Sequence, residues 1–217
     1  MIRLNKFLAL NLNISRRFAD ELISNQLIHV NGLIAQIGQK IDDKKDEVIY
    51  LGNKVEEKIK KYVMFYKPPG YICSHKKQGS TPTIYDIISD TNLKYAGRLD
   101  KESEGLLLLS NDGDWINKLT HPKYQINKIY HVTVEEEINL DTFKTAIEKE
   151  NILYQINKIK KIKSYVYELV LTTGKKREIR EIFQYNKVAI NRLKRVQMGE
   201  YSLENMKPGD IKELDLS

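Results

Sequence analysis

The sequence predicts an α+β protein in which a small N-terminal module precedes a larger domain with a mixed, mainly antiparallel sheet flanked by helices. Three observations favour this fold class. Segments typical of strands and of helices follow one another without the strict β-α-β order of a parallel sheet. The 217 residues suffice for one or two domains, and the 41% hydrophobic content suffices for a real core. A mostly charged stretch, residues 52–61, separates the two parts and reads as a linker.

Residues 1–51 predict two helices followed by short strands. Apolar residues at i, i+3 and i+4 indicate both helices, and Ser15 can cap the second. These apolar positions are Leu4, Phe7 and Leu8 in the first helix and Ala19, Leu22 and Ile23 in the second. Asn31-Gly32 lies between apolar runs at 28–30 and 33–35 and predicts a hairpin, because a type I′ turn needs positive φ at both positions. Another short strand is expected at 48–51.

Residues 62–217 predict the sheet and helices of the larger domain. Strands are expected at residues 62–66, 71–73, 106–109 and 129–134 and within 156–171. Helices are indicated by three apolar sets: Ile84, Ile87 and Ile88; Leu140, Phe143 and Ile147; Ile179, Ile182 and Phe183. Leu106 to Leu109 are four leucines between Gly105 and a turn-forming Asn-Asp-Gly. That run is too short for a helix, so we expect a strand buried on both faces.

The charge distribution predicts a polyanionic partner. The formal net charge is +7. The segment 174–195 carries eight basic and two acidic residues while its apolar residues keep a folded pattern, which indicates a basic face on a packed element. The basic residues are Lys175, Lys176, Arg177, Arg180, Lys187, Arg192, Lys194 and Arg195. Nucleic acid or an anionic membrane surface would satisfy such a face.

Other features narrow the compartment and the chemistry. The single cysteine, Cys73, excludes an internal disulfide and a multi-cysteine zinc site, and we expect it to be a buried small hydrophobe. No apolar run approaches the roughly 18–20 residues of a membrane span. The N-terminal apolar stretch is interrupted by polar residues, so no signal peptide is expected. We therefore expect a cytoplasmic protein without a membrane partner.

The segment Gly97-Arg98-Leu99-Asp100 is the first candidate for chemistry. Arg98 and Asp100 are two residues apart, so in an extended segment they point to the same side. A carboxylate and a guanidinium just before a buried strand suit a cleft. A surface ion pair, typically worth about 0–1 kcal/mol, is the alternative interpretation.

Two further segments carry candidate groups. Arg177 and Arg180 are three apart, and at helical spacing they share a face that can neutralise phosphates or steady a carboxylate. A solvated helix flank is the alternative. In a strand, Lys128 and Tyr130 face the same way, and a tyrosine there can stack on a base or move a proton.

Several site classes lack support in the sequence. His121 is expected to be structural, since no histidine pair has metal-ligand spacing, and no carboxylate cluster suits two-metal chemistry. Phosphate-binding loops, dinucleotide fingerprints and the Gly-x-Ser-x-Gly elbow are absent from the sequence. We expect no metal and no cofactor.

In order along the chain, these motifs resemble those of the ribosomal RNA pseudouridine synthases. The resemblance rests on Lys67-Pro68-Pro69-Gly70, the block from Gly97 to Gly113, Lys128-Ile129-Tyr130 and Arg177-Glu178-Ile179-Arg180. The most similar group contains small-subunit synthase A and large-subunit synthases B, E and F. The segments from Arg3 to Ala9, Ser15 to Arg17 and Val30 to Gly32 resemble an S4 RNA-binding domain.

The resemblance implies a domain plan and a reaction. Residues 1–51 would be the S4 RNA-binding domain, 52–61 the linker and 62–217 the pseudouridine synthase catalytic domain, with the α+β sheet described above. The family isomerises a uridine within RNA: the bond from ribose C1′ to uracil N1 breaks and a bond from C1′ to C5 forms. No redox step or energy-rich donor is needed. The implied partner is ribosomal RNA or a ribosomal subunit precursor, and we expect a monomer because no long heptad pattern is present.

The resemblance also assigns roles to single residues. Asp100 would be the essential carboxylate, acting either as a nucleophile on the sugar or as a base that gives a glycal-like intermediate. Tyr130 would pack against the uracil and transfer a proton at C5. Arg180 would pair with Asp100, keeping it ionised and oriented. Other RNA-binding candidates are Arg98, which would enter the space left by the target base, and Lys67, Arg3, Lys6, Ser15, Arg16, Arg17, Asn31, Lys175, Lys176 and Arg177.

Some positions depart from the usual pattern of these families. Asn5 stands where aspartate is frequent, and Gln26 where a glycine often ends the second S4 helix. Lys175-Lys176 replaces a common Arg-Asn pair but keeps positive charge near the site. These departures concern fine substrate contacts and the strength of RNA docking.

Three other functions compete with this interpretation. The main rival is a non-catalytic S4-type ribosome-associated RNA-binding or assembly factor. A pseudoenzyme that kept the fold and a metal-dependent nuclease are the others. A pure binding module does not need Asp100, Tyr130 and Arg180 together, and a nuclease would need clustered metal ligands.

Overall fold

The computed structural model describes residues 1–216, which fall into two compact units, residues 1–60 and residues from Lys61 onward. The two units are described separately below. Among residues 1–216, no helix is both long enough and apolar enough to cross a membrane.

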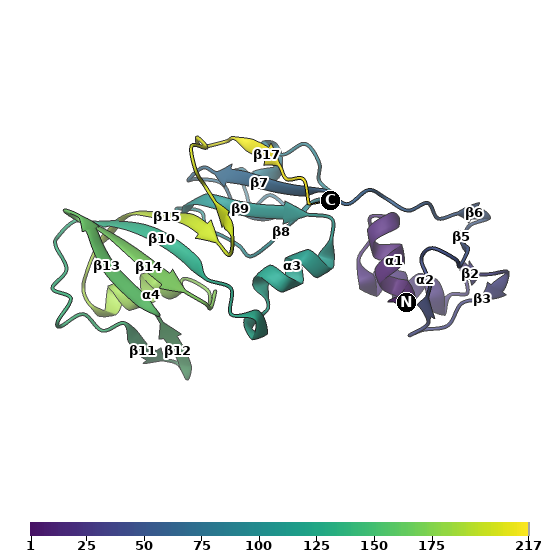
Figure 1. Cartoon of the computed structure of the whole chain (residues 1–217), viewed down its shortest axis with the longest axis horizontal. Coiled ribbons are helices and arrows are strands. Elements are labelled where there is room, and N and C mark those ends of the chain that lie inside the picture. Colours follow the sequence, from purple (N-terminus) through teal and green to yellow (C-terminus); the bar gives the residue numbers. More distant parts are fainter. Residues whose placement is uncertain (217) are drawn as a thin grey trace. The chain divides into compact units, whose positions relative to one another are not determined.

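The first unit packs two helices against short strands (Figure 1). Its elements are β1 (Ile2–Arg3), α1 (Leu4–Asn11), α2 (Arg16–Ser24), β2 (Ile28–Val30), β3 (Leu33–Ile34), β4 (Lys40–Ile41), β5 (Val48–Tyr50) and β6 (Asn53–Lys54). The strands form a sheet of order β3-β2-β5-β6 and a separate β1-β4 pair. All six apolar residues that predict the helices are buried, and the Ser15 side chain accepts a hydrogen bond from the Phe18 amide at 3.0 Å, which confirms both helices and the cap.

The predicted hairpin of the first unit is confirmed, and the predicted linker is corrected. Asn31 and Gly32 have φ of 52° and 78° and join β2 to β3, as a type I′ turn requires. The linker, predicted at 52–61, begins later than expected. Residues 53–54 form β6, and Val55 is buried and donates its amide to Val48 O at 2.8 Å. A short charged strand at a sheet edge has the composition of a linker, which is why sequence alone misses it.

The second unit is built on one nine-stranded sheet. The strands are β7 (Tyr62–Lys67), β8 (Lys94–Tyr95), β9 (Glu104–Ser110), β10 (Lys128–Val134), β13 (Lys158–Lys163), β14 (Val166–Leu171), β15 (Ile190–Met198), β16 (Tyr201–Ser202) and β17 (Ile211–Glu213). Their order is β13-β14-β10-β15-β9-β7-β17, with β16 on β15 and β8 on β9. The pair β15–β9 is parallel and the other pairs are antiparallel. The predicted mixed, mainly antiparallel sheet is therefore confirmed.

Two helices and a hairpin flank this sheet. They are α3 (Gly113–Thr120), α4 (Glu178–Tyr185) and the pair β11 (Ala146–Lys149) and β12 (Ile152–Gln155), with one-turn 3₁₀ helices at Ile84–Asp86 and Pro122–Tyr124. In Figure 1, α4 lies beside β10, β13 and β14, with the β11–β12 hairpin next to it. Ile179, Ile182 and Phe183 of α4 are buried in one cluster with residues of β10, β14 and β15. The predicted last helix is confirmed.

The leucine strand is buried on both faces, as predicted. Leu107 and Leu109 pack into a cluster on one face of β9, while Leu106 and Leu108 pack into a separate cluster on the other. All seven residues of β9 are buried. This strand lies inside the sheet between β15 and β7 and directly follows the loop that contains Asp100.

Three local predictions for the second unit are wrong. Residues 71–73 make one isolated bridge, from Ile72 to Thr83, instead of a strand. The helix predicted from Ile84 is a single 3₁₀ turn, Ile84–Asp86. The helix predicted around 140–147 is a turn followed by β11, in which the Asn139 side chain accepts the amide of Asp141 at 3.1 Å. The Asx turn and the pairing of β11 with β12 bury Phe143 and Ile147 without a helix. In addition, α3 and β15 were not predicted from the sequence.

Candidate active site

Asp100 lies in the loop between β8 and β9, and short contacts hold this loop in place. Gly97 starts it with a φ of 74°, a conformation that glycine adopts without strain. The Asp100 carbonyl accepts the Ser103 amide at 3.0 Å, and the Leu99 amide points at the Cys73 sulfur at 3.5 Å. Cys73 is buried, as predicted. The turn leaves the Asp100 side chain half-buried at the edge of a pocket.

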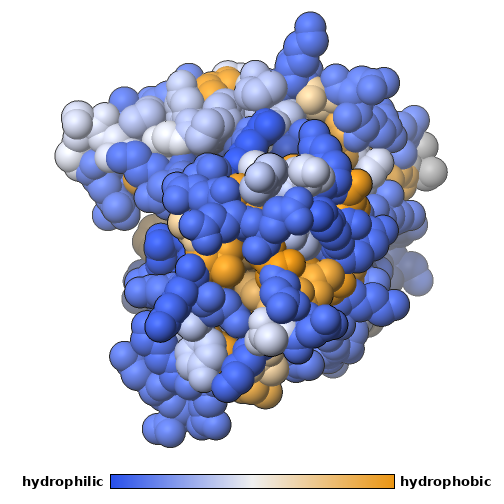
Figure 2. Space-filling view, turned by 90° about the vertical axis from the view of Figure 1, so that its left-hand side faces the viewer, coloured by the Kyte–Doolittle hydropathy of each residue, from blue (hydrophilic) through white to orange (hydrophobic). Residues whose placement is uncertain are grey.

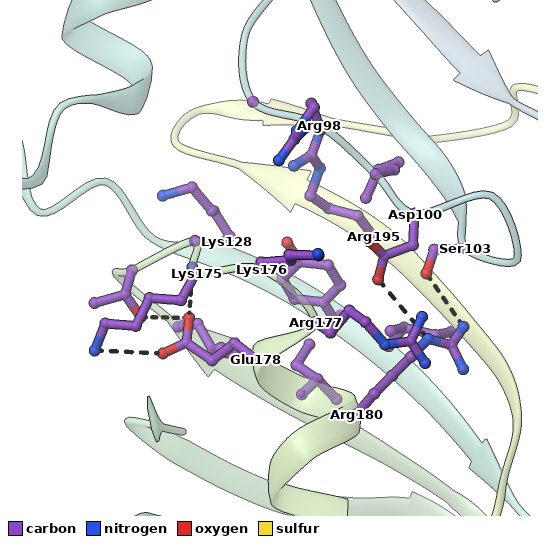
Figure 3. A pocket seen from close by; sticks show the side chains of 18 residues that line it. Arg98, Asp100, Ser103, Lys128, Lys175, Lys176, Arg177, Glu178, Arg180 and Arg195 are labelled. Carbon is purple, nitrogen blue, oxygen red and sulfur yellow. Dashed lines mark hydrogen bonds and ion pairs between the residues drawn. The ribbon is translucent and has the colours of Figure 1, made fainter. Parts of the chain in front are cut away.

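Arg180 of α4 reaches this loop from a distant part of the chain (Figure 3). Its Nε lies 3.9 Å from Asp100 Oδ2, and its Nη2 donates to Ser103 Oγ at 3.3 Å. The Nε atom is buried and, among the residues described, has no hydrogen-bond partner. The guanidinium is therefore anchored at Ser103 and faces the carboxylate at ion-pair distance. The Nε donor faces the carboxylate and is not used by another acceptor among the described residues.

Tyr130 completes the same pocket from the sheet. It lies on β10 opposite Arg195 of β15, so both side chains stand on one face. The ring is half-buried and packs against both the α4 cluster and the β7–β9 cluster, which fixes its position. The pocket lining includes Asp100, Tyr130 and Arg180 together.

The pocket lining is strongly basic. It contains seven basic residues (Arg98, Lys128, Lys175, Lys176, Arg177, Arg180 and Arg195) and two acidic residues (Asp100 and Glu178). Arg98, Lys175, Lys176 and Arg177 are therefore together at the pocket, and each is exposed. Arg177 also lies 3.8 Å from the Glu102 carboxylate. An open cavity with an excess of cations next to one carboxylate suits a polyanionic substrate.

Glu178 is already engaged in shaping the pocket. Its buried carboxylate accepts hydrogen bonds from Thr173 Oγ1 at 2.8 Å and from the Lys175 amide at 3.1 Å. The Lys175 ammonium lies 4.0 Å from the same carboxylate (Figure 3). Glu178 thus holds the loop 173–175 against α4.

Lys67 lies apart from the other predicted RNA contacts of the second unit. Its side chain is 0% exposed and does not line the pocket. The Nζ donates to the carbonyls of Ser103 at 2.6 Å, Pro68 at 3.0 Å and Lys101 at 3.4 Å. Burial lowers the pKa of this ammonium to about 8. Lys67 is sealed beneath the Asp100 loop, where it ties that loop to the Lys67-Pro68-Pro69-Gly70 turn.

The first unit carries the other predicted RNA contacts. Arg3, Arg16 and Arg17 are exposed, and Lys6 is half-buried. The Ser15 hydroxyl accepts the helix-cap hydrogen bond, so it also has a structural role. The Asn31 side chain donates to Asp46 at 2.9 Å and accepts the Glu47 amide at 2.9 Å, which brace the hairpin. RNA contact by these six residues stays a prediction.

Sequence reasoning missed two residues of the pocket and the significance of a third. Ser103 and Glu178 lie within the recognised motifs but received no role. Each is a polar residue near an arginine in the sequence, and this could have suggested that it anchors part of the site. Arg195 belongs to the predicted basic segment, but β15 was not predicted. The apolar residues of this segment, Ile190, Leu193, Val196 and Met198, do not alternate strictly with polar ones, so the local pattern gives no clear strand signal.

Within residues 1–216, no group of three or more His, Cys, Asp or Glu side chains is placed to hold a metal ion. His121 accepts the Lys123 amide through Nδ1 at 3.2 Å, at the start of a 3₁₀ turn. Its observed contact is therefore a local cap.

Comparisons with known proteins agree with this geometry. Residues 61–185 match the family described as RNA pseudouridylate synthase, and residues 2–48 match the S4 domain. The chain is 33% identical to an "Uncharacterized RNA pseudouridine synthase" of Aquifex aeolicus, covering 98% of this chain and 92% of the relative. It is also 33% identical to ribosomal large subunit pseudouridine synthase B of Bacillus subtilis, covering 99% and 92%. A crystal structure of a pseudouridylate synthase is similar, with a TM-score of 0.69, 26% identity and coverage of 99% and 96%.

Proposed function

The chain belongs to the RNA pseudouridine synthase family, and we propose that it isomerises one specific uridine of ribosomal RNA to pseudouridine. It is an isomerase that acts on RNA and carries an N-terminal S4 domain. The ribosomal target is supported by the relative from Bacillus subtilis, which is named for the large ribosomal subunit. The observation that carries the proposal is the meeting of Asp100, Tyr130 and Arg180 in one basic pocket.

Asp100 supplies the carboxylate for the reaction. The pocket presents one carboxylate that no internal turn consumes, since Glu178 is bound by Thr173 and Lys175. Asp100 either attacks ribose C1′ or removes a ribose proton; each route breaks the bond from C1′ to N1. Arg180 orients Asp100 from 3.9 Å and is itself held by Ser103.

Tyr130 positions the uracil and moves a proton. Once the base has detached, it turns and its C5 bonds to C1′, while the bond from C1′ to Asp100 breaks or, on the other route, the removed proton returns to the ribose. The proton on C5 must then leave and N1 must gain one. The atoms balance without any donor, because substrate and product are isomers. The Tyr130 ring, fixed by packing on both sides, offers a flat surface for the base and a phenol for that transfer.

Arg98 acts on the RNA outside the pocket. A base inside a stem or a stacked loop must leave its neighbours before it can enter, at a cost of a few kcal/mol. Arg98 is exposed at the edge of the pocket, where its guanidinium can enter the vacated space. The S4 domain adds contacts to flanking RNA through Arg3, Arg16 and Arg17. The enzyme works as a cytoplasmic monomer on ribosomal RNA or a subunit precursor.

Mapping of pseudouridines in ribosomal RNA tests this function. Cells that lack the gene should lose one pseudouridine, and a plasmid carrying the wild-type gene should restore it. The Asp100→Asn variant should leave the site as uridine while the protein accumulates normally. An unchanged map on deletion of the gene would contradict the ribosomal target and would favour a non-catalytic binding factor. Restoration by Asp100→Asn would remove Asp100 from the mechanism.

A further inference from the structure

We propose that Lys128 and Arg195 together form a binding site for a backbone phosphate next to the target uridine. This proposal rests on the proposed function, because it names a group of the RNA that the pocket holds. Neither residue has a role in the chemistry described above. Their placement, their burial, their partners and the charge around them all point to an anion.

Strand pairing places the two side chains on the floor of the pocket. Tyr130 of β10 pairs with Arg195 of β15, so their side chains share one face of the sheet. Lys128 is two residues before Tyr130 on the same strand and therefore faces the same way. Both cations line the pocket that contains Asp100. Their position is set by the sheet and is thus formed before any ligand arrives.

Both side chains are almost fully buried. Arg195 is 1% exposed and Lys128 is 6% exposed. Fully buried lysine and arginine are rare unless they are paired, because removing a charge from water is costly. Two buried cations at one site need a negatively charged group to compensate the cost of their burial.

The partners within the protein do not supply that compensation. Lys128 Nζ donates to the carbonyls of Thr172 at 3.2 Å and Ile126 at 3.3 Å, which leaves its third donor unused. Arg195 Nε donates to Leu106 O at 2.7 Å, and its Nη2 is buried without any hydrogen-bond partner in the part of the chain that the structure describes. The described residues include no ion pair between a carboxylate and either cation.

Electrostatics indicate that the two cations act on each other. Burial first, and then the positive charge of Arg195, lower the pKa of Lys128, and the Glu178 carboxylate, which is already engaged by Thr173 and Lys175, opposes them less strongly. Two cations that repel at a fixed separation form a site whose energy falls when an anion binds both. The orphaned Nη2 of Arg195 and the spare donor of Lys128 are the groups that such an anion would use.

The chemistry of RNA identifies the anion as a phosphate. Uracil and ribose offer neutral oxygen atoms, whereas the phosphodiester carries the charge that two desolvated cations require. A nucleotide that enters the pocket brings its own phosphates, since they are bonded to the same ribose. Arginine matches phosphate through two parallel donors, and lysine adds a point charge.

Exposed lysines of the second unit differ from this buried pair. Figure 2 shows a face of the molecule that is mostly hydrophilic, with apolar residues confined to a few patches. The lysines of β13 are exposed, and two of them, Lys160 and Lys161, pair with carboxylates at 2.9 Å and 2.6 Å. These are solvated ion pairs, in contrast to the buried and uncompensated pair on the pocket floor.

The first test needs no substrate and so does not depend on the proposed function. The full chain, labelled with ¹⁵N on lysine and arginine side chains, is titrated with inorganic phosphate and followed by NMR. Lys128→Met identifies the Lys128 signal by its loss, and Arg195→Lys does the same for Arg195. We expect both signals to shift together and to saturate, and the Arg195 shift to be lost in Lys128→Met. Signals that stay unchanged while those of exposed lysines move would overturn the proposal.

The second test uses the RNA target found by mapping. Replacing either phosphate next to the target uridine by a neutral methylphosphonate removes one charge at a time. For one of the two positions, we expect kcat/KM of the wild type to fall about tenfold, the scale of one charge-assisted hydrogen bond. With unmodified RNA, the Lys128→Met variant should have a kcat/KM about tenfold below that of the wild type. The methylphosphonate should then cause no further loss in this variant.

A matched variant separates the phosphate site from general attraction. Lys118→Met removes an exposed lysine of α3 outside the pocket and should keep the full methylphosphonate effect. If the losses in kcat/KM caused by Lys128→Met and by the methylphosphonate multiply, the proposal is overturned. If the wild type makes no pseudouridine in ribosomal RNA, the proposed function fails by itself, and the phosphate titration still decides the site. Should Arg195→Lys not fold, Lys128→Met carries both tests.

Discussion

Lys67 shows how a buried charged side chain can support the site from beneath the Asp100 loop. Its ammonium is enclosed by three backbone carbonyls, two of which belong to the loop that carries Asp100. The sequence places this lysine in a motif of the family but does not reveal on which side of the loop it lies. Hydrogen bonding and position decide that point: the Lys67 ammonium donates to three carbonyls and does not line the pocket, so it holds the loop and has no donor left for a phosphate.

The buried state of Lys67 predicts a pH dependence of stability. Its pKa is lowered by burial to about 8, from an ordinary value of 10.5. Between these values the folded chain binds fewer protons than the unfolded chain, so stability rises with pH. We expect the free energy of unfolding of the wild type, relative to Lys67→Met, to increase by roughly 1–2 kcal/mol between about pH 7.5 and about pH 9.5.

Urea unfolding of both proteins across this pH range measures that difference. Other titrating groups cancel, because they are present in both proteins. Lys123→Met, which removes an exposed lysine, should show no such trend. A difference between wild type and Lys67→Met that is constant with pH would mean that the lysine stays charged in the folded chain.

At the scale of elements, the contact between β9 and β15 joins the Asp100 loop to the rest of the sheet. It is the parallel pair of the sheet, with Gly105 opposite Arg195. A Cβ added to Gly105 would overlap the Arg195 carbonyl oxygen and lie 2.8 Å from the Arg195 amide nitrogen. The φ of 106° at Gly105 is also unfavourable for other residues. Glycine is therefore required for the two strands to approach.

Gly105→Ala should destabilise the second unit strongly. Backbone atoms must move to relieve the overlap, so we expect a loss of about 3 kcal/mol or more in the free energy of unfolding. Gly113→Ala is the matched control, since a Cβ added there would meet nothing within 4 Å and the residue starts a helix. Denaturant unfolding compares the two variants. Equal stability of the two would show that β9 and β15 do not approach as closely as the structure has them.

The elements that the sequence predicts well are those with a strong local signal. Four leucines in a row, a Ser-capped amphipathic helix and an Asn-Gly turn each depend on neighbouring residues only, and each forms as expected. The segment around 140–147 has helical spacing, but the pairing of β11 with β12 overrides it. β15 was missed because its residues are mostly polar or basic, and its place comes from pairing with β9 and β10.

At the scale of the whole molecule, the sequence predicts the identities of the site residues better than their partners. Asp100, Tyr130 and Arg180 lie in recognisable motifs, and the fold brings those motifs together. The anchoring by Ser103 and the burial of Arg195 depend on contacts between distant segments, which spacing along the chain does not contain.

RNA affinity should fall as the salt concentration rises, and residues of the first unit should contribute part of this dependence. The slope of log affinity against log salt should be about 0.7 per neutralised phosphate for single-stranded RNA. We expect the double variant Arg16→Gln and Arg17→Gln to lower affinity and to reduce this slope by about 1.4, because each arginine then releases one counterion fewer. The turnover of bound RNA should be unchanged, since the pocket residues belong to the second unit.

Fluorescence anisotropy with a labelled ribosomal RNA fragment at several salt concentrations measures this slope. The control is Lys44→Gln with Lys45→Gln, which removes the same charge from exposed positions of the same unit. A slope that is unchanged in the arginine variant, or equally reduced in the control, would mean that Arg16 and Arg17 make no specific phosphate contacts.

The rate of pseudouridine formation by purified Asp100→Asn tests the central role of Asp100 most directly. The substitution keeps the shape of the side chain but removes the charge that faces Arg180 at 3.9 Å. We expect a rate at least about a thousandfold below wild type, with RNA affinity within about threefold, because the lost group acts in the chemical step. Asp141→Asn, at an exposed carboxylate outside the pocket, should keep the wild-type rate. Formation of pseudouridine by Asp100→Asn at close to the wild-type rate would contradict the account.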